Sequence, residues 1–104
     1  MKKFSLDPNP TFRFPVPIPV PGEKVADVVF VFRHKTKRDL NDLIERSKKD
    51  MSDIDLMMEI ACGWDLDDPF NVDTVTQMLE NYHGAAMAIS NTYVKELTGR
   101  REKN

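Results

Sequence analysis

Residues 11–34 read TFRFPVPIPVPGEKVADVVFVFRH, and their pattern decides the fold. From Phe12 to Val20, bulky apolar residues alternate strictly with a second set made of arginine and prolines. The apolar set is Phe12, Phe14, Val16, Ile18 and Val20, and the second set is Arg13, Pro15, Pro17 and Pro19. A period of two is typical of a β-strand with one buried face. We therefore predict a strand over residues 11–20 whose apolar set faces a core.

The prolines predict where this strand lies in its sheet. Backbone N–H groups alternate between the two edges of a strand, so Pro15, Pro17 and Pro19 remove donors along one edge only. The other edge keeps its donors and can pair with a neighbour. We expect an edge strand whose outer side cannot template further pairing. A polyproline II ligand segment is the alternative, but the bulky Val and Ile at alternate positions fit it less well.

A second strand is predicted from Val25 to His34, which makes residues 11–34 a β-hairpin. Pro21-Gly22 fits the centre of the intervening turn, because Gly adopts the positive φ that a type II turn requires. Residues 28–32 are apolar on both faces of the strand. Such a strand is either covered on both sides or keeps one face for a partner.

Four helices are expected over residues 36–98, each placed by capping residues and an apolar stripe. Their expected ranges are Thr36 to Lys49, Ser52 to Cys62, Asn71 to His83 and Ala85 to Leu97. No strand is expected after a helix. The predicted fold class is therefore α+β, an N-terminal β-hairpin packed against about four short α-helices.

The chain is expected to form one domain, since 104 residues can bury a core without metals or disulfides. Residues 1–10 are predicted to be a loose arm and residues 99–104 a charged tail. The single cysteine, Cys62, cannot form an intramolecular disulfide, which fits a reducing compartment. No apolar run resembles a signal peptide or a membrane span, so we expect a cytoplasmic protein with no membrane partner.

The net charge of −2 conceals a strong segregation. Residues 1–49 carry 11 basic and 6 acidic side chains, whereas residues 50–94 carry nine acids and no Lys or Arg. The one basic cluster, residues 33–38, is too small for a nucleic-acid footprint, so no nucleic-acid partner is expected. The acidic segment is interpreted as a solvated surface. The alternative is that it attracts a basic partner or a second copy of the chain.

No residues with catalytic, cofactor-binding or metal-binding roles are predicted. Cys62 and His83 could pair as nucleophile and base, but a small buried hydrophobe and a helix-end histidine explain them better. One Cys and two His cannot complete a zinc site. The acids of residues 65–68 lack the Gly and Glu that a calcium loop needs at its sixth and twelfth positions. The chain is not expected to be an enzyme.

Several segments, in order and spacing, are similar to a known family. They are the strand Phe12–Val20 with Pro21-Gly22, the strand Val28–Arg33, the junction from Glu59-Ile60 to Gly63-Trp64, the segment Asp68-Pro69-Phe70 and the helical pattern from Tyr82 to Tyr93. The chain thereby resembles, over nearly its whole length, the small tail assembly chaperones of long-tailed bacteriophages and prophages. The resemblance depends on order and length, not on any single motif.

The resemblance implies a non-enzymatic role in the cytoplasm of a bacterial host cell. Such chaperones bind the long, largely helical tape measure protein and keep it soluble while tail tube subunits polymerise around it. They are absent from the finished virion. Many are encoded beside a longer frameshift product that recruits the tail tube protein, which would add a second partner. The alternative function is a structural tail completion or connector subunit that stays in the particle.

A chaperone of this kind needs exposed apolar surface for its client. The two-faced strand, the adaptable methionines and the aromatic loop are the best sources of such surface. The residues predicted to contact a partner protein are Phe30, Phe32, Met57, Met58 and Trp64. The family has no universal binding motif, so the resemblance itself assigns no site residues.

Overall fold

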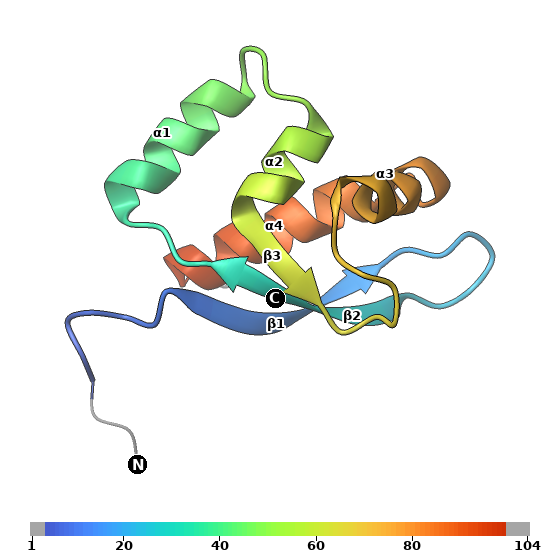
Figure 1. Cartoon of the computed structure of the whole chain (residues 1–104), viewed down its shortest axis with the longest axis horizontal. Helices are drawn as coiled ribbons and strands as arrows, with labels where there is room; N and C mark the ends of the chain where they lie inside the picture. Colours follow the sequence, from blue (N-terminus) through green and yellow to red (C-terminus); the bar gives the residue numbers. More distant parts are fainter. Residues whose placement is uncertain (1–3, 100–104) are drawn as a thin grey trace, which may run out of the picture.

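The computed structural model describes residues 4–99 and places a three-stranded sheet against four helices (Figure 1). In chain order the elements are β1 Thr11–Ile18, β2 Ala26–Arg33, α1 Lys37–Ser47, α2 Asp53–Ile60, β3 Ala61–Trp64, α3 Val72–Asn81 and α4 Ala85–Thr98. The α+β class and the hairpin packed on four helices are therefore confirmed.

The hairpin has the predicted arrangement. β1 pairs with β2 in antiparallel register, with Phe12 opposite Phe32, and β1 lies at the edge of the sheet. The amide of Glu23 donates to the carbonyl of Val20 at 3.0 Å across the turn, and Gly22 has the expected positive φ of 75°. The amide of His34 donates to the carbonyl of Pro10 at 2.9 Å, so the even-numbered residues of β1 turn their backbone hydrogen-bonding groups toward β2 and the prolines at odd positions turn theirs toward the outer edge. Because proline has no backbone N–H, a further strand finds no donors from Pro15 and Pro17 at that edge.

The expectation that no strand follows a helix was wrong. α2 ends at Ile60, and β3 pairs with the second edge of β2, with Val31 opposite Gly63. The cause lies in Arg33, whose guanidinium Nη1 donates to the carbonyls of residues 58, 59 and 61 at 2.8, 3.2 and 2.9 Å. A cation that binds the last carbonyls of a helix stabilises its end. Residues 61–64 then pair with the open edge of β2 and satisfy its backbone hydrogen-bonding groups. Cys62 lies in this strand and is exposed, although it was expected to be buried.

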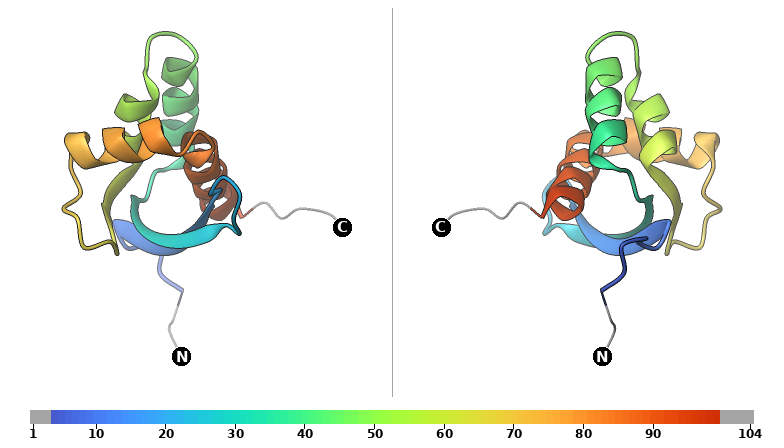
Figure 2. Two further views of the ribbon diagram at one scale, coloured as in Figure 1. Left: turned by 90° about the vertical axis from the view of Figure 1, so that its right-hand side faces the viewer. Right: turned by 90° about the vertical axis from the view of Figure 1, so that its left-hand side faces the viewer.

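All four helices lie on one face of a strongly curved sheet, and the core fills the space between them (Figure 2). The buried residues are Val16, Ile18, Val28, Phe30, Phe32, Leu40, Leu43, Met57, Ile60, Ala61, Val75, Ala85, Ile89 and Tyr93. The ring of Tyr93 in α4 packs 5.2 Å from that of Phe32. Its hydroxyl donates to the carbonyl of Arg33 at 2.8 Å, and burial raises the pKa of Tyr93 to about 12.

The opposite face of the sheet carries no helix (Figure 2). Val29 and Val31 are half-buried there, while Pro15 and Pro17 of β1 are exposed. β2 is therefore not covered on both sides: within residues 4–99, no helix lies on one of its two faces.

Phe32→Ala is predicted to lower the free energy of unfolding by about 3–5 kcal/mol, because it removes a fully buried ring from a packed core. Val31→Ala, one residue away on the uncovered face, should cost no more than about 1 kcal/mol. Urea titrations of both variants and the wild type measure the difference. Equal losses at the two positions would contradict the assignment of the faces.

Candidate protein-binding groove

An open groove of about 670 Å³ lies along the outer side of α2, between the end of α1 and the start of α3. Its lining residues are Arg46, Lys49, Asp50, Met51, Ile54, Asp55, Met58, Glu59 and Val72. Sites for compact ligands occupy about 300–1,000 Å³. The groove is therefore large enough for several apolar side chains of a partner.

The floor of the groove is apolar because α2 carries more hydrophobic residues than its core-facing side uses, while Asp55 and Glu59 form part of the polar rim. Ile54 and Met58, spaced by four residues, share the outer face, and Met51 lies just before the helix. A capping box fixes the start of α2, since the amide of Asp55 donates to Ser52 Oγ at 3.1 Å and the amide of Ser52 to Asp55 Oδ2 at 3.4 Å. This cap sets which residues face outward.

A network of ion pairs forms the wall on the α1 side. Arg46 of α1 donates to both carboxylate oxygens of Glu59 in α2, at 3.0 and 2.6 Å, and to Asp42 at 2.9 Å. Lys35 lies 3.3 Å from the same Glu59 carboxylate. These hydrogen bonds, that of Arg46 first, lower the pKa of Glu59 from 4.5 to about 2. The network joins α1 to α2 at the rim of the groove.

Three of the five predicted contact residues cannot touch a partner in this fold. Phe30, Phe32 and Met57 are 2%, 0% and 2% exposed, so the prediction that they contact a partner was wrong. The phenylalanines lie on the face of β2 that the helices cover, and Met57 points from α2 into the core. The sequence did not reveal the inward face, because both faces of β2 are apolar and the hydrophobic residues of α2 extend beyond one face.

The other two predicted residues are half-buried. Met58 lines the groove. Trp64 lies in β3, where its indole Nε1 donates to the carbonyl of Asp68 at 2.8 Å and its ring meets Phe70 edge-on at 5.1 Å. Trp64 also borders a smaller hollow of about 280 Å³, with Leu66 among its neighbours. A direct contact from Met58 or Trp64 to a partner stays a prediction.

Sequence reasoning did not single out Met51, Ile54 and Val72 as a site. Val72 is exposed at the start of α3. The spacing of Ile54 and Met58 was the one available signal, and it is also the spacing of an ordinary core stripe. The groove combines residues 46–59, from the end of α1 through α2, with the more distant Val72.

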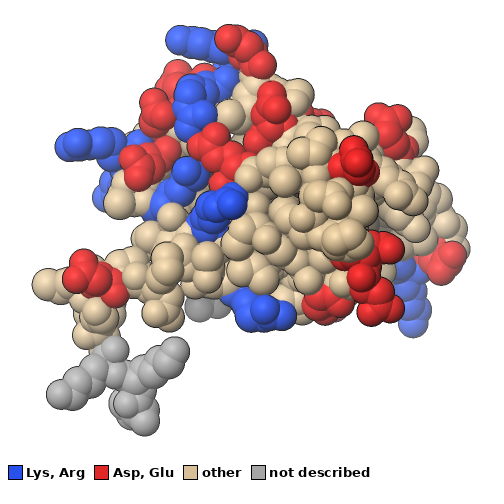
Figure 3. Space-filling model, in the orientation of Figure 1, with Lys and Arg blue, Asp and Glu red and all other residues tan. Residues whose placement is uncertain are grey.

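The surface charge follows the segregation in the sequence. In Figure 3 most Lys and Arg side chains lie over α1, whereas the surface over α3 is acidic and apolar. Within residues 4–99 no three His, Cys, Asp or Glu side chains come together in a way that could hold a metal ion. In the same range no helix is long and apolar enough to cross a membrane.

The family model of phage tail assembly chaperones matches residues 1–104 of this chain, its full length. The chain belongs to the phage tail assembly chaperone family. No curated protein and no solved structure matches it. Family membership confirms the resemblance seen in the sequence and favours a non-enzymatic role.

Glu59→Gln is predicted to reduce stability at pH 7 but not at pH 2. The lowered pKa of Glu59 means that its contribution is complete above pH 4.5 and is lost as the pH falls toward 2. Wild type and variant should therefore differ in melting temperature at neutral pH and converge near pH 2. A constant difference from pH 7 to pH 2 would show that the Arg46–Glu59 pair does not act as described.

Proposed function

We propose that this chaperone binds the phage tape measure protein in the cytoplasm of the bacterial host and keeps it soluble during tail assembly. The groove along α2 is the observation that carries the proposal. It offers apolar surface on a folded domain whose own core is already complete. Family membership supports the chaperone role, and the groove adds a place for a client.

The groove suits an amphipathic helix as its client segment. Helical ligands insert apolar residues spaced by three, four or seven positions into such surfaces. Met51 and Met58 have unbranched, polarisable side chains that adapt to different partners, as a chaperone of a long and varied helical client requires. The charged residues Arg46, Glu59 and Asp55 surround this apolar floor with solvated groups.

The mechanism requires no covalent chemistry. Binding covers apolar stripes of the client that would otherwise associate with one another. Because each contact is weak and reversible, tube subunits that bind the same client segments displace the chaperone by mass action. The chaperone then leaves the growing tail, in contrast to a structural completion or connector subunit.

Met58→Lys is predicted to weaken binding of the tape measure protein at least tenfold, because client binding would desolvate a charge in the apolar floor. Met87→Lys is the matched control: Met87 is 69% exposed in α4, outside the groove. Co-expression with tape measure fragments, followed by separation of soluble and pelleted client, measures the effect. Wild type and Met87→Lys should keep the client soluble, and Met58→Lys should not.

Two results would contradict the proposal. In the first, Met58→Lys, with an unchanged melting temperature, solubilises the client as well as the wild type. In the second, mass spectrometry finds the protein at fixed stoichiometry in purified phage particles, which would favour a structural subunit over a chaperone.

A further inference from the structure

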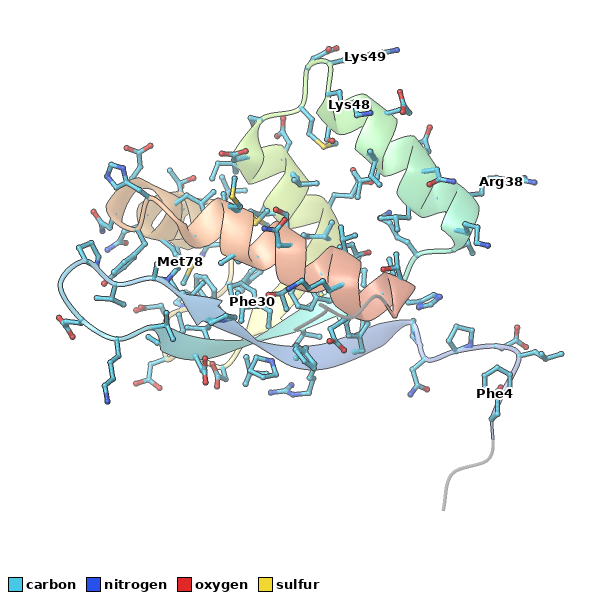
Figure 4. The ribbon with its side chains drawn as sticks, turned by 180° about the vertical axis from the view of Figure 1, so that it is seen from behind. Phe4, Phe30, Arg38, Lys48, Lys49 and Met78 are labelled. Atoms are coloured by element: carbon cyan, nitrogen blue, oxygen red, sulfur yellow. The ribbon has the colours of Figure 1, made fainter. Side chains whose placement is uncertain are left out.

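The arm before β1 carries the two most exposed large apolar side chains in the part of the chain that the structure describes. Phe4 is 92% exposed and Leu6 is 90% exposed. Ser5 and Asp7 form local hydrogen bonds with each other, and the domain holds the arm at Pro10, whose carbonyl accepts from the amide of His34 at 2.9 Å. In Figure 4 Phe4 points away from the domain. Removing apolar side chains of this size from water is favourable, and a monomer leaves both of them in water.

The arm is built to project from the domain. Pro8 and Pro10 each fix φ near −65° and restrict the residue before them, so residues 7–10 have little backbone freedom. A stiff segment loses less conformational entropy when it binds than a flexible one. The prolines therefore favour docking of the arm onto another molecule.

The groove of the same chain is not the natural target. The arm leaves from the start of β1, beneath the sheet, whereas the turn between α1 and α2 that borders the groove lies at the far side of the helices (Figures 1 and 2). Figure 4 places Phe4 and Lys49, a lining residue of the groove, at opposite ends of the domain. From Pro10 to Phe4 the arm spans at most about 20 Å.

We propose that Phe4 and Leu6 of one chain dock into the groove along α2 of a second copy. The two side chains are separated by one residue, and both are about nine-tenths exposed. Together they present one compact apolar unit to a floor of Met51, Ile54, Met58 and Val72. Self-association of this kind covers the most exposed apolar side chains of one copy with the apolar groove of the next.

The charges of the two surfaces match. Two lysines precede Phe4 in the sequence, while residues 50–94, which supply most of the groove, contain acids and no Lys or Arg. The groove is lined by the acids Asp50, Asp55 and Glu59 against the basic residues Arg46 and Lys49, and Arg46 is already paired with Glu59 and Asp42. The attraction between arm and groove should therefore weaken as salt is added.

The arm of a second copy and a client would compete for one groove. Self-association would then cover the groove while the client is absent, and a client at sufficient concentration would displace the arm. The proposal does not depend on which client the groove holds.

Sedimentation over a concentration series tests the proposal with the full chain. The wild type and the control Met87→Lys should associate as concentration rises. The arm variant Phe4→Ser/Leu6→Ser and the groove variant Met58→Lys should each associate at least tenfold more weakly. The decisive sample is an equimolar mixture of the two weak variants, in which one supplies an intact arm and the other an intact groove. Association should return in the mixture.

A wild type that stays monomeric up to millimolar concentration would overturn the proposal. So would an arm variant that associates like the wild type, or a mixture of folded variants that fails to associate. None of these outcomes bears on the solubility of tape measure fragments in the co-expression assay, so failure of the arm proposal is distinguishable from failure of the proposed function.

Discussion

The structure depends on the contacts that Arg33 makes at the end of β2. Its carbonyl accepts the hydroxyl of Tyr93, which seats α4 against the aromatic core of the hairpin. Its guanidinium binds the last carbonyls of α2, which ends that helix and directs the chain into β3. One residue therefore fixes two helices relative to the sheet. The orientation of α2, and with it the groove, follows from this junction.

The candidate site follows from the composition of α2. Its hydrophobic residues extend beyond the side that faces the core, while Asp55 and Glu59 keep another side polar. Here the sheet, α3 and α4 cover only the inner side, which holds Met57 and Ile60. Ile54 and Met58 remain at the surface, beside Met51 and Val72. The apolar surface that a chaperone needs is thus the part of α2 that the core does not use. The ion pairs of Glu59 hold α1 beside it as a wall.

Much of the fold could be predicted because the deciding signals are local. The alternation in β1, its one-sided prolines and the caps at Thr36, Ser52 and Asn71 act within a few residues. β3 could not be predicted, since four residues after a helix become a strand only through pairing with β2 and the distant Arg33. The site was harder still. Sequence reasoning identified Met58, but it placed Phe30, Phe32 and Met57 on the surface, because apolar residues on both faces do not indicate which face turns inward.

The proposed function requires that apolar side chains beside α2, and not those elsewhere on the surface, contact the client. Methyl NMR of methionine-labelled protein during titration with a tape measure fragment tests this claim most directly, because methionines lie both inside and outside the groove. We expect the methyl signals of Met51 and Met58 to shift on binding and the signal of Met87 to stay unchanged. Shifts at Met87 with unchanged signals from Met51 and Met58 would contradict it.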